Sequence, residues 1–218
     1  MEQQILSLDE IKEIYSDSLA THYDHSLLLY RLLGFRIKTY RKKAVQSLNL
    51  NPGDTVVDLG CGTGLNFPLL NNHVGKQGTI IGVDLSKNML QQAQDRIQDS
   101  GLNNIKLIQA DMSEYHIPSN ADAILSTLAI SMSPDYDRII ERVAHTLETR
   151  KKMAIFELKR PEKWPKWLVK AMIKLLHSYG TRYEHSKRTP WLSMEKYFRK
   201  LYMQEFYFGA VYVATGVV

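Results

Sequence analysis

The chain has 218 residues, of which 44% are hydrophobic and 23% charged, and this composition is typical of a folded protein with one substantial core. Its net charge of +5 permits contact with an anionic surface, but the excess is too modest to indicate a nucleic-acid partner by itself. Because Cys61 is the only cysteine, an internal disulfide is excluded, and we expect a cytoplasmic protein with neither a membrane span nor a signal peptide.

The first predicted element is helical and covers about residues 8–48. Apolar and aromatic side chains recur there at spacings of three and four residues, ending with Leu33, Ile37, Tyr40, Ala44 and Leu48. The basic cluster RIKTYRKK at 36–43, which includes Arg41, lies largely off this stripe, so we interpret it as a solvated face. The sequence NLNPGD at 49–54 then ends the helix.

Short apolar runs alternate with amphipathic segments over the next hundred residues or so. The runs predict strands at 55–59, 79–85, 105–110, 121–127 and 152–158. The amphipathic segments predict helices near 64–73, 87–100 and 135–148, the second capped by Ser86 and ended by Gly101. This alternation indicates a parallel sheet covered on both faces. The closing sequence MQEFYFGAVYVATGVV predicts two further strands that meet at Gly209.

A glycine-rich turn, VVDLGCGTGLN at 56–66, follows the first of these strands. A turn of this kind at the carboxyl end of a parallel strand lets backbone N–H groups approach a ligand closely. Dinucleotide-binding folds use G-x-G-x-x-G, whereas this turn reads G-x-G-x-G with Asp58 just before it. A carboxylate suits a cationic ligand better than a pyrophosphate, so the turn favours S-adenosylmethionine, which carries an amino group and a sulfonium.

Two more acids stand behind the next two predicted strands. Asp84 ends the second strand, where a carboxylate can accept hydrogen bonds from two ribose hydroxyls. Asp111 and Met112 follow the third strand, where a carboxylate and a backbone N–H can pair with adenine. A single loop aspartate is usually a cap or turn residue, but three acids in this order favour S-adenosylmethionine over a dinucleotide.

The motifs VVDLGCGTG, IIGVDLS, IQADM and ADAILSTLAIS, in this order over about residues 50–158, resemble those of class I S-adenosylmethionine-dependent methyltransferases. The resemblance implies an α/β fold: a Rossmann-like, doubly wound, seven-stranded sheet with the last strand antiparallel and helices on both faces. It also implies that Gly60, Gly62 and Gly64 approach the methionine part of the cofactor.

By the same resemblance, Asp58 lies near the cofactor's amino group, Asp84 holds the ribose, and Asp111 and Met112 address adenine. Tyr23, in THYDHS, resembles a tyrosine that many members bring over the cofactor, although a core tyrosine is the alternative. Cys61 is interpreted as a small residue that fits the turn. The remaining candidate cofactor-binding residues are Asn66, Leu85, Met89 and Ser126.

The sequence assigns no catalytic residue and no metal site. Methyl transfer from a sulfonium is an in-line displacement, for which positioning can supply most of the catalysis. The histidines lack metal-binding spacing, and one cysteine makes a zinc site improbable.

We expect one domain over residues 1–218: a helical cap at 1–48, a cofactor-binding core at 50–158, a helical lid at 159–200 and a strand pair at 201–218. Within the lid, a predicted helix at 163–176 carries Trp164 and Trp167 on its apolar face. Beside them runs a stripe of lysines at Lys163, Lys166, Lys170 and Lys174. Such a helix can lie in a membrane interface or close over the pocket, and the sequence leaves both interpretations open.

A narrower resemblance, carried by GTGLNFPLL and EFYFGAVYVATG, is to small bacterial methyltransferases of the phosphatidylethanolamine and quinone type. It implies a lipid amine or a lipophilic quinone as the methyl acceptor. The alternatives are N- or O-methylation of a soluble metabolite, a nucleic-acid methyltransferase, and a non-catalytic cofactor-binding protein. We expect no nucleic-acid partner, because LSTLAISMSPDY stands where a base-flipping N-P-P-Y-type motif would fall.

Overall fold

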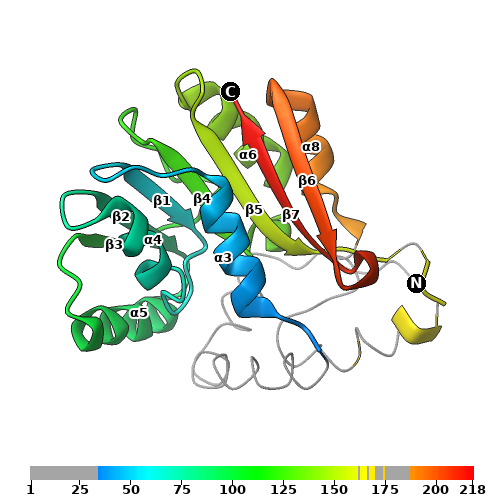
Figure 1. Ribbon diagram of the computed structural model, residues 1–218, viewed down its shortest axis with the longest axis horizontal. Coiled ribbons are helices and arrows are strands. Elements are labelled where there is room, and N and C mark those ends of the chain that lie inside the picture. The colour runs from blue at the N-terminus through cyan, green and yellow to red at the C-terminus, as the bar shows by residue number, and fades with distance from the viewer. Residues whose placement is uncertain (1–33, 162, 166, 170–173, 175–186) are drawn as a thin grey trace.

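The computed structural model describes residues 34–161, 163–165, 167–169, 174 and 187–218. These residues form a seven-stranded sheet of order β3-β2-β1-β4-β5-β7-β6, flanked by helices (Figure 1). Tyr23, the N-terminal cap up to residue 33 and half of the predicted helix at 163–176 lie outside the described residues.

The strands match the predicted apolar runs. Their bounds are β1 Thr55–Leu59, β2 Thr79–Asp84, β3 Ile105–Gln109, β4 Ala123–Thr127, β5 Lys152–Leu158, β6 Lys200–Phe206 and β7 Val211–Val217. The first five pair in parallel, whereas β7 is antiparallel to both of its neighbours, β5 and β6. The turn Tyr207–Gly209 joins β6 to β7. The predicted Rossmann-like sheet with an antiparallel last strand is therefore confirmed.

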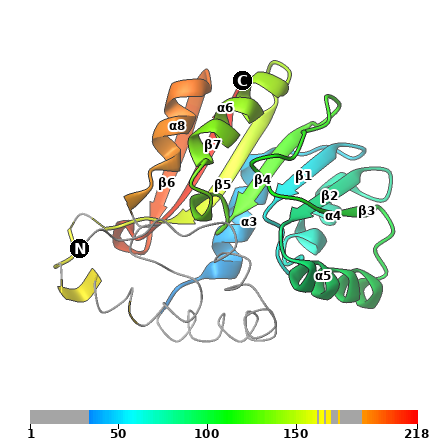
Figure 2. The same ribbon diagram turned by 180° about the vertical axis from the view of Figure 1, so that it is seen from behind.

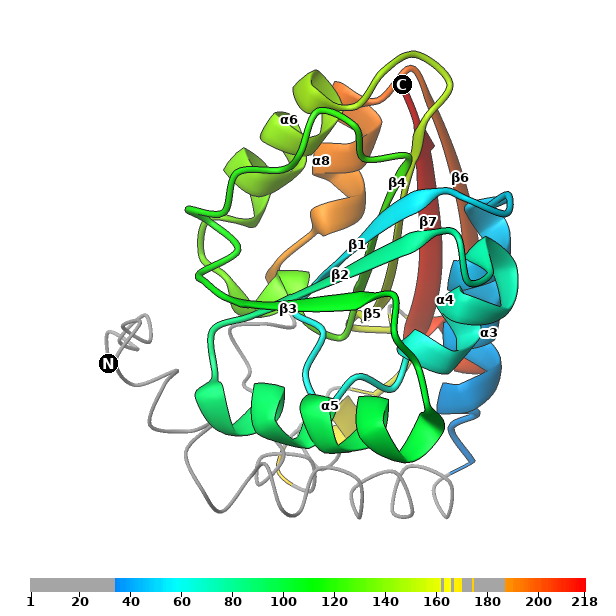
Figure 3. The same cartoon turned by 90° about the vertical axis from the view of Figure 1, so that its left-hand side faces the viewer.

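Two hydrophobic clusters cover the two faces of the sheet. Helices α3 (Ile37–Ser47), α4 (Phe67–Val74) and α5 (Lys87–Ser100) contribute to one cluster, and α6 (Tyr136–Thr146) and α8 (Pro190–Tyr197) to the other. Figure 2 brings α6 and α8 to the front, and Figure 3 shows α3 and α4 on the opposite side. The central strands β1, β2, β4 and β5 are buried on both faces, because successive side chains alternate between the two clusters, as Val56 and Val57 do.

Local chemistry explains where the helices begin and end. Ser86 caps α5 by accepting a hydrogen bond from the Met89 N–H at 3.3 Å, and Gly101 ends the helix with φ +62°. Helix α4 begins at Phe67 rather than near residue 64, because Gly64 has φ +76° and cannot continue a right-handed helix. The glycine turn is consequently longer than the sequence predicted.

Helix α3 buries one basic residue that was predicted to face solvent. Arg41 is 6% exposed, so the interpretation of the cluster at 36–43 as a solvated face is wrong at this position. Periodicity missed it because polar partners from other elements, described below, receive its guanidinium. Among the residues that the structure describes, we find no helix long and apolar enough to cross a bilayer.

Candidate active site

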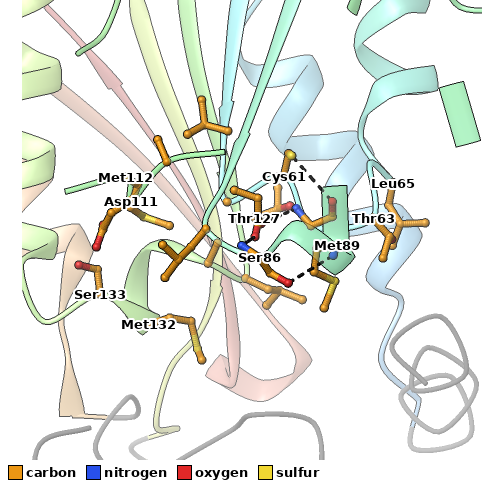
Figure 4. Close-up of a pocket in the computed structure, with 18 of the residues that line it drawn as sticks. Cys61, Thr63, Leu65, Ser86, Met89, Asp111, Met112, Thr127, Met132 and Ser133 are labelled. Atoms are coloured by element: carbon orange, nitrogen blue, oxygen red, sulfur yellow. Dashed lines mark hydrogen bonds between the residues drawn. The ribbon is translucent and has the colours of Figure 1, made fainter. Parts of the chain in front are cut away.

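A pocket lies at the carboxyl ends of β1, β2, β3 and β4, where the loops that follow these strands converge (Figure 4). Parallel α/β sheets characteristically bind ligands at this edge. The residues that line the pocket are Arg41, Gly60, Cys61, Gly62, Thr63, Leu65, Val83, Asp84, Leu85, Ser86, Met89, Ala110, Asp111, Met112, Thr127, Leu128, Ala129, Met132 and Ser133.

The three glycines of the turn have different surroundings. A Cβ on Gly60 would lie 2.3 Å from the Ala129 Cβ, and one on Gly64 would lie 2.6 Å from the Phe67 ring. A Cβ on Gly62 would meet no atom within 4 Å, and this residue lines the pocket. Gly60 and Gly64 are therefore required by packing inside the protein, whereas Gly62 leaves space on the ligand side.

Asp84 ties the glycine turn to the end of β2. One carboxylate oxygen accepts from the Gly62 N–H at 2.8 Å, and the other accepts from the Ser86 N–H at 2.9 Å. Burial raises the pKa of Asp84, while these backbone hydrogen bonds oppose the rise. Each carboxylate oxygen keeps a further lone pair, so the side chain can still accept hydrogen bonds from a ligand.

A buried polar network lies beside the turn. Asn66 donates from its amide nitrogen to both oxygens of Asp58, at 3.1 and 2.9 Å, and to the Thr127 hydroxyl at 3.0 Å. Arg41 donates to the Asn66 side-chain oxygen at 3.0 Å and to the Thr127 hydroxyl. Burial raises the pKa of Asp58 to about 7, although the Asn66 hydrogen bond and the Arg41 charge both lower it. The network holds the guanidinium of Arg41, which is part of the pocket lining.

The loop after β3 is held by an arginine of α6. Arg142 donates to the carbonyl oxygens of Met112 and Ser113, at 2.6 and 2.5 Å. The Ser113 N–H in turn donates to the Asp111 carboxylate at 2.7 Å. Asp111 and Met112 are thereby fixed on the pocket wall.

The pocket brings together most of the residues that the sequence singled out. Those that line it are Gly60, Cys61, Gly62, Asp84, Leu85, Met89, Asp111 and Met112. Four others lie behind the lining: Asp58, Gly64, Asn66 and Ser126. The Ser126 hydroxyl donates to the Leu59 carbonyl oxygen at 2.9 Å, which ties β4 to β1.

Sequence reasoning missed two parts of the lining. Arg41 was hidden in a basic cluster whose periodicity suggested solvent. The second part is the wall formed by the last residue of β4 and the segment after it, which begins within the motif ADAILSTLAIS. From that motif only Ser126 was selected, whereas the lining contains Thr127, Leu128, Ala129, Met132 and Ser133. The alternation of side chains along a strand could have identified this difference. Ser126 and Thr127 must face opposite sides of β4, so only one of them can point into the pocket.

Burial of two acids predicts an unusual dependence of stability on pH. Glu157 on β5 is also buried, and this raises its pKa to about 7, as for Asp58. Between about pH 4 and 7 the native protein therefore holds protons that the unfolded chain has released. The free energy of unfolding should fall by on the order of a few kcal/mol as pH rises through this window.

Thermal melts of the protein without ligand, taken between pH 5 and 8, would measure this dependence. Glu157→Gln should reduce its slope, because glutamine does not titrate and the contribution of Asp58 remains. A melting temperature that rises across the window, or a slope unchanged in the variant, would contradict the expected effect of burying these acids.

The strand order with its antiparallel β7 and the pocket at the ends of the parallel strands define the class I S-adenosylmethionine-dependent methyltransferase fold. A family model described as a methyltransferase domain matches residues 50–203, and the chain belongs to this family.

Solved structures share the fold. A "SAM dependent methyltransferase" from Aquifex aeolicus superposes with a TM-score of 0.62 and 20% identity, covering 82% of this chain and 89% of its own. A phosphoethanolamine N-methyltransferase 2 of Haemonchus contortus, solved with S-adenosyl-L-methionine, gives a TM-score of 0.66 and 17% identity, covering 93% of this chain and 46% of its own.

Among curated proteins, the demethylmenaquinone methyltransferase of Oceanobacillus iheyensis is 32% identical over 127 residues, which are 58% of this chain and 53% of that protein. The chain spans about half the length of the curated relatives it matches.

The lining residues fit the cofactor of this class. The space beside Gly62 admits a ligand to the glycine turn, and Asp84 and Asp111 offer acceptors for hydroxyl and amino groups. Arg41 supplies a cation at the same pocket, suited to a carboxylate.

Proposed function

We propose that this chain is an S-adenosylmethionine-dependent methyltransferase that methylates a lipophilic reduced quinone. The observation that carries the methyltransferase part is the ordered site itself: the open position at Gly62 and the carboxylates Asp84 and Asp111 share one pocket at the strand ends. Two further observations support a quinone as the methyl acceptor: the apolar wall after β4, and the demethylmenaquinone methyltransferases among the relatives.

Each part of the cofactor would have its own residues. Asp84 would bind the ribose hydroxyls through its remaining lone pairs, and Asp111 with the Met112 N–H would bind adenine. Arg41 would bind the methionine carboxylate as a charge-assisted pair. Asp58 holds Asn66, whose oxygen receives Arg41, so the buried acid would keep that guanidinium oriented.

When bound, S-adenosylmethionine supplies an electrophilic methyl group. The work left to the chain is to bind both molecules, align them and exclude water. In the described part of the chain, the pocket lining contains no histidine, and its acids are Asp84 and Asp111. The proposal therefore assigns catalysis to alignment. A hydroxyl group of the acceptor would lose its proton to solvent and so activate the ring carbon for attack on the methyl group, whose bond to sulfur breaks. The ring proton that the methyl group replaces would then pass to that oxygen and restore the quinol.

The acceptor side of the pocket favours an apolar molecule. Leu128, Ala129 and Met132 form the wall after β4, and Met112 faces the same pocket from the loop after β3. Such a wall gains free energy by burying a ring or an isoprenoid tail, at roughly 25 cal/mol per Å² of apolar surface. A small charged metabolite would gain little from it.

The tail separates the candidate acceptors. We would compare kcat/KM for a 1,4-naphthoquinol carrying one isoprene unit with that for the same ring lacking the tail, and with ethanolamine lipids. The proposal expects the tailed quinol to be preferred. Preference for the lipid amine, or for the tail-free ring, would replace the quinone with a lipid amine or a soluble metabolite.

We further propose that the protein reaches such an acceptor at an anionic membrane surface. Trp167 is 70% exposed and Phe208, at the β6–β7 turn, is 82% exposed. Trp164 and Tyr207 have ring centroids 6.0 Å apart, and Tyr207 and Phe208 also 6.0 Å, so the lid segment and the turn adjoin. The turn lies at the sheet edge where β5 ends (Figure 1).

Backbone and charge support the same surface. Tyr207 and Phe208 have φ values of +49° and +55°, which are unfavourable for aromatic residues, so the surrounding packing must hold the turn in this shape. Part of that packing is the Phe35 ring, which stacks on Tyr207 with ring centroids 3.9 Å apart. Arg160 and Lys163 are exposed on the adjoining segment. Exposed aromatic rings beside basic side chains are typical of proteins that bind the interface of anionic bilayers.

Co-sedimentation with phosphatidylglycerol vesicles would test this surface. Trp167→Ser combined with Phe208→Ser should weaken binding at least about tenfold, because two apolar side chains no longer insert. Tyr202→Ser combined with Leu192→Ser is the matched control, since these residues are 61% and 51% exposed on β6 and α8. Equal loss in both pairs, or no vesicle binding by the unmodified protein at low salt, would contradict the proposal.

A further inference from the structure

A buried acid outside the pocket holds one of the pocket's walls. Glu157 lies near the end of β5 and is 2% exposed. Its two carboxylate oxygens accept from the Ser131 N–H at 3.1 Å and from the Ser131 hydroxyl at 2.8 Å. Burying a carboxylate costs free energy unless it is hydrogen-bonded. Two hydrogen bonds join Glu157 to Ser131, so this buried acid fixes the position of one residue and of the segment that carries it.

An arginine holds the same segment by its carbonyl groups. Arg188, just before α8, donates to the carbonyl oxygens of Ser131 and Met132, both at 2.6 Å. The short helix η1 (Ile130–Met132) is therefore bound through Ser131 by β5 and through its carbonyls by the segment that precedes α8. Glu157 and Arg188 together will be called the η1 clamp.

The clamped segment forms the wall of the pocket that follows β4. Ala129, Met132 and Ser133 line the pocket, and Ile130 and Ser131 between them are buried. The acids proposed to bind the cofactor are held by other groups: Asp84 by Gly62 and Ser86, and Asp111 by Ser113. A shift of η1 would thus move the apolar wall while leaving those acids in place.

We propose that Glu157 and Arg188 are positioning residues that fix Met132 as the wall against which the methyl acceptor is aligned. This inference rests on the proposed function, because it assigns the wall to the acceptor rather than to the cofactor. Alignment is where such a clamp has its largest effect, since a displacement of about 1 Å can reduce the rate roughly 100-fold.

A second arginine provides a matched control. Arg142 holds carbonyl groups of the loop after β3, as Arg188 holds those of η1, but its loop carries Asp111. Arg188→Met should lower kcat/KM for the tailed naphthoquinol about tenfold or more, at saturating S-adenosylmethionine, and leave the Kd of S-adenosylhomocysteine within about twofold. Arg142→Met should do the reverse, raising that Kd with less effect on kcat/KM for the acceptor.

Further variants separate the two sides of the clamp and guard against misfolding. Glu157→Leu removes both acceptors of Ser131, and Ser131→Ala removes the hydroxyl whose hydrogen bond Glu157 accepts. Arg188→Lys keeps the charge and should restore part of the kcat/KM that Arg188→Met loses. Carbon-13 methyl spectra of methionine-labelled protein would follow the wall directly, without turnover. The Met132 signal should shift or broaden in the clamp variants while the Met89 signal stays unchanged.

The proposed acceptor and the positioning role of Glu157 and Arg188 would be contradicted by different results. If the unmodified protein does not methylate the quinol, the proposed acceptor is wrong, and the methyl spectra still report whether Glu157 and Arg188 fix Met132. If the protein does methylate it, but Arg188→Met changes the Kd of S-adenosylhomocysteine by as large a factor as kcat/KM for the acceptor, the positioning role is overturned. An unchanged Met132 signal in Glu157→Leu and Arg188→Met would overturn it as well.

Discussion

Gly62→Val is expected to abolish binding of S-adenosylmethionine while the sheet stays folded. A Cβ at this position meets nothing within 4 Å, and the residue lines the pocket, so the valine side chain would enter space that the ligand requires. The backbone has φ +55°, and a branched residue there adds strain of roughly 1–2 kcal/mol. That strain is small enough for the fold to survive.

The contribution of strain can be measured separately. Gly101→Val is the matched control, because Gly101 has φ +62°, also has nothing within 4 Å of a Cβ, and ends α5 outside the pocket lining. Calorimetry with S-adenosylhomocysteine and thermal melts by circular dichroism would compare the two variants. Equal affinity in both, or unfolding of Gly62→Val alone, would mean that this glycine serves chain geometry and not the ligand.

Asp84→Ala is expected to raise the Kd of S-adenosylhomocysteine by at least about 100-fold. Hydrogen bonds to a charged acceptor contribute about 1.5–3 kcal/mol each, and two ribose hydroxyls would lose theirs. The substitution also removes the acceptor of the Gly62 N–H, so the glycine turn loses its tie to β2. The lost ribose hydrogen bonds and the loosened glycine turn both weaken binding, and a modified ligand distinguishes them.

A double-mutant cycle with the ligand isolates the ribose contact. The unmodified protein should lose affinity for a 2′-deoxy analogue, whereas Asp84→Ala should bind both ligands equally weakly. Asp122→Ala is the control, because Asp122 also accepts a backbone N–H, that of Thr55, but at the opposite ends of β1 and β4. A deoxy analogue that binds the unmodified protein as well as the parent ligand would contradict a ribose role for Asp84.

The sequence predicted the fold well because its signals are local. Apolar runs located the strands, and the cap at Ser86 and the αL glycine at Gly101 located the ends of α5. The start of α4 was misplaced because Gly64 has a positive φ and lies against the Phe67 ring, and no local pattern reveals either feature.

The site was predictable where a single residue at the end of a strand lines the pocket, as Asp84 and Asp111 do. Arg41 was not, because its burial depends on Asn66 and Thr127, which lie far from it in sequence. The wall held by Glu157 and Arg188 was missed for the same reason, since its contacts join segments brought together only by the folded sheet.

Transfer of labelled methyl from S-adenosylmethionine tests the central claim most directly. The protein would be incubated with separate pools of reduced quinones, lipid amines and soluble amines and phenols, with Gly62→Val as the blank. We predict label in the organic extract of the quinone pool, formed by the unmodified protein and absent from the blank. Binding of the cofactor without label in any pool, or label formed equally by the blank, would contradict a methyltransferase built on this pocket.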